Sequence, residues 1–290
     1  MNGILLIDKP SGWTSSDIVA KLRGILHERR IGHSGTLDPM ATGLLVVFVG
    51  RATRAVEFAE SHSKRYLAGL RLGITTDTQD ISGNKLAEKP VNVTDGMLET
   101  ALEAFRGEIS QVPPMYSAIK INGKKLYEIA RKGGSVERKA RSITIHELRV
   151  LSREGEDFLL DIHCSKGTYV RTLCNDIGET LGCGGCMSSL RRMKAGDFSM
   201  ENAYTLEQVQ SAADKGEAEK LLLPLDSLFS ACPAVTVSAK GERSIRNGGG
   251  ASTADAADGL CRVYSGTGEF LALGNAQNGA IKIVKSFFEV

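Results

Sequence analysis

Residues 32–45 read GHSGTLDPMATGLL, and no other stretch of the chain is as informative. Its three glycines permit tight turns and a close approach of the backbone to a ligand. Asp38 is its one carboxylate, and Pro39 fixes the backbone directly after it. By local chemistry Asp38 is either a candidate acid, base or nucleophile, or the side chain of an Asx-turn or helix cap. The stretch is neither a P-loop nor a dinucleotide fingerprint, because GxxxxGK[ST] and GxGxxG are absent from it.

Regular secondary structure is predicted on both sides of this Gly-rich loop. Residues 3–8 form a short apolar run that predicts a buried strand. Ser15 or Ser16 can cap a following helix, whose apolar residues between 18 and 26 fall on one face. The apolar run 44–49 predicts a buried strand that leaves the loop.

The rest of the chain mixes strands and helices with few clean βαβ alternations. The predicted strands are 64–72, 143–150 and 158–164, the last two paired across a polar turn at 152–157, and the predicted helices lie at 94–105 and 169–181. After residue 233 the sequence consists of short β-like runs between Gly-rich turns. We therefore predict an α+β fold: a mixed, largely antiparallel sheet with helices and loop insertions, plus a small C-terminal β domain.

Length and composition exclude several classes of protein. The chain has 290 residues, 42% of them hydrophobic and 24% charged, which is typical of a globular protein with about two domains. This composition argues against a disordered chain, a collagen-like chain and a disulfide miniprotein. No apolar run reaches the roughly 18 residues of a membrane span, and the start of the chain lacks signal-peptide features. We expect a cytoplasmic protein.

Positive charge is concentrated in one segment. The whole chain carries a net charge of +2, but residues 114–153 hold ten Lys and Arg against three Asp and Glu, a net +7. Such a segment is either a solvated surface loop or an arm that neutralises phosphates.

The six cysteines include one close pair, Cys183-Gly-Gly-Cys186. A zinc ribbon needs a second such pair, and a redox site needs a thioredoxin-like context. We predict reduced, structural cysteines and no metal, with small residues here letting two backbones approach.

Residues 32–45 are similar to the signature motif of the TruB-type tRNA pseudouridine synthases. Six further stretches resemble the other motifs of that family in the family's order: 8–15, 64–66, 73–83, 111–118, 165–173 and 190–196. Together they span about residues 3–198. The resemblance implies an isomerase that converts the T-loop uridine of tRNA, conventionally position 55, to pseudouridine with no cofactor and no metal.

The resemblance also implies the catalytic residues. Asp38 is the essential carboxylate, usually described as a nucleophile, and Arg171 is its ion-pair partner. Burial alone would raise the pKa of an aspartate, and a guanidinium that holds the carboxylate with two hydrogen bonds offsets that effect. Tyr66 is expected to stack on the flipped uracil and to assist proton transfer.

Other residues are implied to shape the site or to bind RNA. His33 is expected to fill the space that the flipped base leaves, and Leu190 to form part of an apolar wall around that base. Lys9 and Pro10 are expected to shape the edge of the site rather than to react. An insertion within about 114–153, which includes Lys124 and Lys125, is expected to grip the RNA stem-loop through phosphate contacts.

These expectations give residues 1–230 as the catalytic domain and residues 231–290 as a PUA-like RNA-binding domain, the latter through a short match at 244–249. The expected partner is the T-arm stem-loop of tRNA, with no membrane and no obligate protein partner, and the protein is expected to be a monomer. One alternative is an RNA-binding or tRNA-folding factor whose main role needs no catalysis. An aspartyl phosphotransferase is disfavoured, because the sequence shows no second carboxylate or metal pattern.

Overall fold

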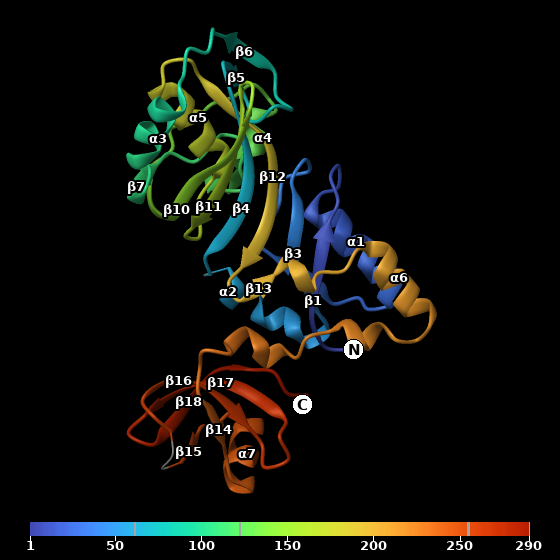
Figure 1. The fold of residues 1–290 in the computed structure, drawn as a ribbon. Helices are drawn as coiled ribbons and strands as arrows, with labels where there is room; N and C mark the ends of the chain where they lie inside the picture. Colours follow the sequence, from blue (N-terminus) through green and yellow to red (C-terminus); the bar gives the residue numbers. More distant parts are fainter. Residues whose placement is uncertain (61, 122, 254–255, 290) are drawn as a thin grey trace.

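The structure is a computed structural model that describes residues 1–60, 62–121, 123–253 and 256–289. It has a large body built on one long mixed sheet and a small body at the C-terminal end (Figure 1). Both contain strands and helices, so the prediction of an α+β fold is confirmed. Among the described residues, no helix is long and apolar enough to cross a membrane.

The main sheet runs in the order β1-β3-β12-β4-β11-β10-β7. The strands are β1 (Gly3–Lys9), β3 (Thr42–Val49), β12 (Gly185–Ala195), β4 (Lys64–Leu72), β11 (Asp157–Cys164), β10 (Arg141–Glu154) and β7 (Gly107–Gln111). Neighbours pair antiparallel, as predicted, except where β12 meets β3. That parallel seam consists of two residue pairs, Arg191 with Thr42 and Arg192 with Gly43.

Helices cover the two halves of the sheet separately. Helices α1 (Ser15–Leu26) and α6 (Leu206–Asp214) pack on the half formed by β1 and β3 (Figure 1). Helices α3 (Asp95–Glu103) and α5 (Val170–Thr180) pack on the half formed by β4, β11 and β10. Each half therefore has its own apolar core, and the seam between β3 and β12 joins them.

The N-terminus of α1 differs from its prediction. The N-cap is Thr14, whose side chain accepts from the Asp17 backbone N–H, while the Asp17 carboxylate accepts from the Thr14 backbone N–H. This capping box needs an acid three residues after the cap, which favours Thr14 over Ser15 or Ser16. The Ser15 hydroxyl instead bonds the backbone N–H and carbonyl of Leu37, at 2.9 and 3.2 Å. It thereby fixes the residue before Asp38.

The predicted Gly-rich loop is shorter than expected. Strand β2 (Ile31–Ser34) pairs with β3, because edge pairing to a long buried strand overrides the weak strand preference of its glycine. The loop itself is left with residues 35–41. The polar turn expected at 152–157 is also mostly strand, since β10 and β11 pair as far as Glu154 with Asp157.

Short elements complete the large body: α2 (Val56–Ala59), β5 (Ile74–Thr76), β6 (Lys85–Glu88), β8 (Lys120–Ile121), β9 (Lys124–Lys125), α4 (Leu126–Ala130) and β13 (Phe198–Ser199), with 3-10 turns η1 (Gly50–Ala55), η2 (Met200–Asn202), η3 (Ala218–Leu221) and η4 (Leu225–Phe229). Of these, β8, β9 and α4 build the basic arm inside the segment 114–153.

The small body is a five-stranded sheet of order β14-β16-β17-β18-β15. Its elements are β14 (Ala234–Thr236), α7 (Ala239–Arg246), β15 (Ala251–Ser252), β16 (Gly259–Tyr264), β17 (Phe270–Gln277) and β18 (Ala280–Ser286). Helix α7 was not predicted. The body has its own core around Val263 and Leu271, and an aromatic contact of Phe229 with Phe270 and Phe287 attaches it to the large body.

The paired cysteines lie where helix and sheet approach closely. Cys183 and Cys186 are buried and not disulfide-bonded. Gly178 of α5 faces Gly185 at the start of β12, and a Cβ at Gly178 would overlap the Gly185 backbone. The small residues therefore do let two backbones approach.

We predict that Gly178→Ala destabilises the fold, because backbone atoms of β12 cannot move aside for the new methyl. Overpacking of this kind costs about 1–3 kcal/mol of unfolding free energy in urea denaturation. Gly24→Ala in α1 is the matched control, since nothing lies within 4 Å of its Cβ position. The control should be neutral or slightly stabilising. Equal stability of both variants would contradict the close approach.

Candidate active site

Buried Lys9 shapes the loop that carries Asp38. Its ammonium donates to the carbonyls of Ala41 at 2.6 Å, Pro10 at 2.9 Å and Pro39 at 3.2 Å. Burial lowers the pKa of Lys9 to about 8, although the charge of Asp38 opposes this shift. The structure thus places Lys9 inside the loop as its support, while Pro10 is exposed at its edge.

Asp38 and Arg171 meet at the open end of this loop. Arg171 Nε lies 3.0 Å from Asp38 Oδ2, and Nη2 donates to Oδ1 at 3.3 Å. The Arg171 side chain is 7% exposed, whereas that of Asp38 is 37% exposed. The carboxylate is therefore held at two points by a buried guanidinium and still reaches solvent, as an accessible nucleophile must.

Arg171 also organises the surrounding segments. It donates to the carbonyls of Tyr116 at 2.8 Å and Thr78 at 3.1 Å. A second carboxylate, Asp80, is 4% exposed and lies 3.5 Å from Arg171 Nη1. Asp80 belongs to the stretch 73–83, but its role could not be predicted, because the charge balance of a buried guanidinium depends on contacts that exist only in the folded protein.

The loop around Asp80 is closed by its own side chain. Asp80 Oδ1 accepts hydrogen bonds from the Thr78 hydroxyl at 3.0 Å, from the Ser82 backbone N–H at 3.0 Å and from the Ser82 hydroxyl. Arg171 lies in ion-pair contact with both Asp38 and Asp80. The two carboxylates are thus organised around a guanidinium. Among the described residues, no group of three or more His, Cys, Asp and Glu side chains could hold a metal ion.

Opposing effects act on the pKa of Asp38. Burial raises the pKa of its carboxyl and the nearby charge of Asp80 adds to that rise, while Arg171 and Lys9 counteract it. The balance leaves the pKa of Asp38 above its ordinary value. Arg171 thus opposes the effect of burial, as expected, without cancelling it.

Tyr66 lies on β4, between Ile162 of β11 and Arg192 of β12, and is 9% exposed. Leu190 belongs to the same apolar cluster, together with Leu37 from the loop before Asp38. Burial raises the pKa of the Tyr66 hydroxyl, and the Arg192 guanidinium opposes the rise. The free protein therefore presents a protonated phenol beside an apolar wall.

His33 lies on β2, opposite Val47 of β3. It is half-buried, and its Nδ1 is buried without a hydrogen-bond partner among the described residues. Burial and the Arg192 charge lower its pKa, so the ring is neutral near pH 7.

Gln111 is a further residue that sequence reasoning missed. Its buried side chain donates to the Tyr169 carbonyl at 3.1 Å and accepts from the Tyr169 N–H at 2.8 Å. Tyr169 is the N-cap of α5, and Arg171 follows two residues later. The amide therefore fixes the start of the helix that presents Arg171.

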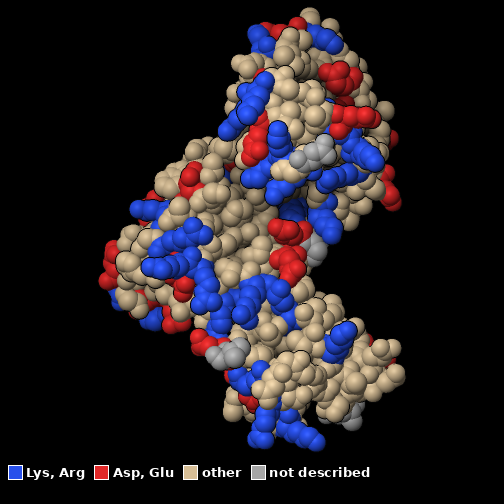
Figure 2. Space-filling model, turned by 180° about the vertical axis from the view of Figure 1, so that it is seen from behind, with Lys and Arg blue, Asp and Glu red and all other residues tan. Residues whose placement is uncertain are grey.

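The basic arm begins beside the site and extends from it. The arm is fixed by bonds from the Tyr127 N–H to the Ser117 carbonyl and from the Leu126 N–H to the Ile119 carbonyl. Its base is tied to Arg171 through the Tyr116 carbonyl. Lys124 and Lys125 form β9, and Lys124 is exposed. On the face seen in Figure 2, Lys and Arg form several groups on both bodies.

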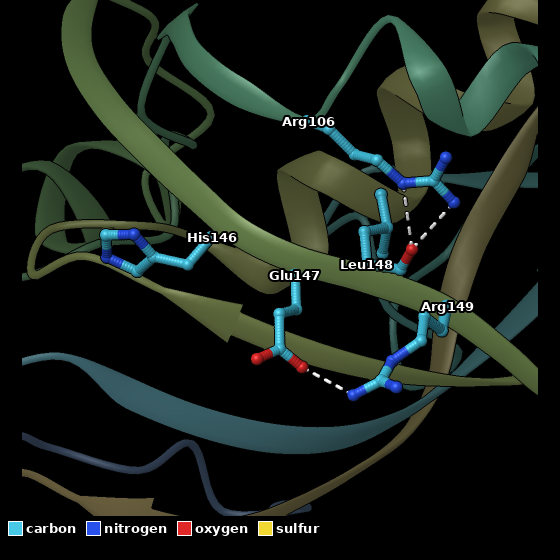
Figure 3. A pocket seen from close by; sticks show the side chains of 5 residues that line it. All are labelled: Arg106, His146, Glu147, Leu148 and Arg149. Carbon is cyan, nitrogen blue, oxygen red and sulfur yellow. Dashed lines mark hydrogen bonds and ion pairs between the residues drawn. The ribbon is translucent and has the colours of Figure 1, made fainter.

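A shallow hollow elsewhere on the sheet is a weaker candidate (Figure 3). Both of its arginines are already paired with other groups that line it. Arg106 donates from Nε and Nη2 to the Leu148 carbonyl at 3.0 and 2.9 Å, and Arg149 bonds Glu147 at 2.5 Å. The Asp38 site is therefore the stronger candidate.

Comparisons with known proteins agree on one family. A profile described as TruB family pseudouridylate synthase (N terminal domain) matches residues 23–170, and one described as tRNA pseudouridylate synthase B C-terminal domain matches residues 171–230. A protein named tRNA pseudouridine synthase B from Azoarcus sp. (strain BH72) is 44% identical, covering 97% of this chain and 93% of the relative. A protein of the same name from Yersinia pestis is 42% identical, covering 97% and 90%.

Two solved structures share the fold. A chain in the crystal structure of a Cbf5-Nop10-Gar1 complex aligns with a TM-score of 0.77 and 27% identity, covering 99% of this chain and 85% of that one. A chain in the structure of an H/ACA RNP bound to a substrate RNA containing 2'-deoxyuridine aligns with a TM-score of 0.76 and 25% identity, with the same coverage.

We predict that Asp38→Asn makes the protein more stable at neutral pH. A carboxyl whose folded-state pKa is raised destabilises the fold when ionised. This cost is absent below the ordinary pKa of 3.8 and is complete above the folded-state pKa. Urea denaturation at pH 7 should therefore give the variant a higher free energy of unfolding than the wild type. The difference between the two free energies should become smaller towards pH 4. A less stable Asp38→Asn protein at pH 7 would contradict this balance.

Proposed function

This chain belongs to the TruB family of pseudouridylate synthases, and we propose that it isomerises the uridine at position 55 in the T-loop of tRNA to pseudouridine. The observation that carries the proposal is the two-point contact of Arg171 with a partly exposed Asp38, close to the apolar wall of Tyr66 and Leu190. A reactive carboxylate beside a surface suited to a planar base fits this chemistry.

The reaction requires a nucleophile and a proton carrier. The C1′–N1 glycosidic bond breaks, a C1′–C5 bond forms, and the uracil exchanges a proton on C5 for one on N1. Ionised Asp38 is proposed as the nucleophile, attacking either the ribose or the base. Arg171 keeps the carboxylate oriented for attack, and Tyr66 is proposed to take part in the proton transfer.

The target base has to leave the RNA stack before any of these groups can reach it. We propose that the ring of Tyr66 stacks on the extruded uracil and that Leu190 closes the other side of the wall. His33, neutral and half-buried at the edge of the loop, would occupy the place of the base in the RNA. Lys9 and Pro10 would contribute by shaping that edge.

RNA affinity is proposed to come from surfaces outside the pocket. Lys124 and Lys125 on the basic arm would contact phosphates of the T-arm, which gives affinity without reading sequence. We further propose that residues 1–230 are the catalytic domain and residues 231–290 a PUA-like RNA-binding domain. The separate core around Val263 and Leu271 and the end of the matched family region at residue 230 support this division.

A second function has a structural basis. The lysines of β9 lie on a hairpin separate from the Asp38 loop, so RNA binding and catalysis are separable in this fold. A protein that binds, opens and releases tRNA would assist its folding even without isomerisation. Cells in which Asp38→Asn replaces the wild type would show which role matters for growth.

We predict that Asp38→Asn abolishes pseudouridine formation on unmodified tRNA, because the amide is not a nucleophile. Arg171→Lys should lower turnover about 100-fold, since a lysine keeps the charge but loses the two-point contact, while RNA affinity changes little. Pseudouridine mapping and single-turnover kinetics measure both effects. Wild-type rates in Asp38→Asn would defeat the assignment of Asp38.

We predict that Lys124→Ala with Lys125→Ala weakens tRNA binding and flattens its salt dependence. Each lost phosphate contact should change the log–log slope by about 0.7–0.9. Filter binding from low to moderate salt measures this slope. Lys215→Ala, an exposed lysine at the end of α6, is the control. If the double variant keeps the wild-type slope, these lysines do not touch phosphate.

A further inference from the structure

Arg192 is the largest fully buried side chain of the described residues, with 1% exposure. It lies on β12 at the parallel seam. Its Nε donates to the Leu44 carbonyl at 2.7 Å, and its Nη2 donates to the Gly35 carbonyl at 2.8 Å. These two carbonyls lie at either end of the loop that carries Asp38. One side chain therefore spans the loop from its first residue to the strand that follows it.

The guanidinium of Arg192 has no carboxylate within ion-pair distance among the described residues, and its bonded partners are the carbonyls of Leu44 and Gly35. A buried charge without a counter-ion is costly, and an apolar side chain of similar volume could fill the same space at lower cost. Packing alone therefore does not account for an arginine at this position.

The guanidinium lies against Tyr66. The two residues are register partners on β12 and β4. The titratable groups that face Tyr66 are Arg192, Asp38 of the loop and Cys164 of β11. Negative charge on Asp38 or Cys164 disfavours an ionised Tyr66, whereas Arg192 favours it. Arg192 is the cation that favours an ionised Tyr66, and buried Lys64, two residues before Tyr66 on β4, interacts with the charges of Arg192 and Cys164.

The loop is built to admit this guanidinium. Gly35 has a φ of +66°, which side-chain-bearing residues rarely adopt, and a Cβ there would lie 3.1 Å from Arg192 Nη1. The backbone of Gly35 can therefore approach the guanidinium closely because this residue has no side chain.

We propose that Arg192 is a positioning residue of the reaction, which ties both ends of the Asp38 loop to β12, next to the strand that carries Tyr66, and presents a guanidinium without an ion-pair partner among the described residues to the Tyr66 hydroxyl. The inference rests on the proposed function. During isomerisation C5 loses a proton and N1 gains one. A protonated Tyr66 that gives its proton to N1 and later takes the proton from C5 is unchanged at the end. Between these two transfers the Tyr66 oxygen carries negative charge, which Arg192 stabilises.

The test combines catalysis with a direct titration of Tyr66. The full-length protein is labelled with 3-fluorotyrosine, and the Tyr66 resonance is identified by its loss in Tyr66→Phe. Arg192→Met should raise the titration midpoint of Tyr66 and lower kcat about 100-fold, with KM for a T-arm RNA within a few-fold of wild type. Arg191→Met is the matched control, because Arg191 pairs with Asp8 at 2.8 Å and is not a register partner of Tyr66. It should leave the Tyr66 midpoint unchanged.

A purely structural role would lower kcat without moving the Tyr66 midpoint, and that result would overturn the proposal. Arg192→Gln covers the case in which the methionine variant does not fold. Glutamine can donate to one of the two carbonyls but carries no charge, so the Tyr66 midpoint should rise and kcat should fall at least tenfold. An unchanged Tyr66 midpoint or a wild-type kcat in Arg192→Gln would also overturn the proposal. The titration needs no substrate, so failure of the proposed function, seen as absent pseudouridine with wild-type protein, is distinguishable from failure of this inference.

Discussion

A buried guanidinium needs its charge and its donors satisfied, and the site is arranged around that need in Arg171. Its partners come from separate segments: the carboxylates of Asp38 and Asp80 and the carbonyls of Thr78 and Tyr116. Leaving the buried Arg171 charge unpaired would cost more folding free energy than any one of these contacts contributes. The same arginine thus fixes the Asp38 carboxylate, the loop of Asp80 and the base of the basic arm. One buried side chain holds together segments of the proposed site that lie far apart in the chain.

The site lies at the seam of the sheet for a structural reason. Each half of the sheet has its own core, so the halves can pack independently, and the β3–β12 pairing joins them over two residue pairs. Gly43 is needed there, because a Cβ would overlap the Arg192 backbone. Short pairing leaves loops free at the junction, and loops held by rigid elements commonly carry catalytic side chains. Where β3 and β12 do not pair, buried Lys9 and Arg192 hold the Asp38 loop by donating hydrogen bonds to backbone carbonyls in the loop and at the start of β3.

Much of the fold follows from local sequence patterns, and the errors have a common origin. Strand β4 was predicted with its observed bounds, because the recurrence of Tyr66, Leu67, Leu70 and Leu72 within a short segment is a local signal. Strand β2 was missed because its pairing with β3 decides its conformation, not its glycine-containing sequence. At the site, motif resemblance pointed to Asp38 and Arg171. The roles of Asp80, Gln111 and Arg192 could not be predicted, because each depends on charge balance or amide contacts between residues far apart in the chain.

The buried charges explain how Asp38 can be partly buried and still become ionised. Burial and Asp80 both disfavour ionisation of Asp38, and a deeper position would leave the carboxyl neutral and unreactive. Two nearby cations, Arg171 and Lys9, limit that effect. Lys9 is itself easier to deprotonate than an ordinary lysine, so the stronger and permanent counter-charge is the arginine. In the proposed reaction, a carboxylate that is partly exposed and poorly solvated loses little hydration when it forms a covalent bond, so the cost of burying Asp38 would add to its reactivity.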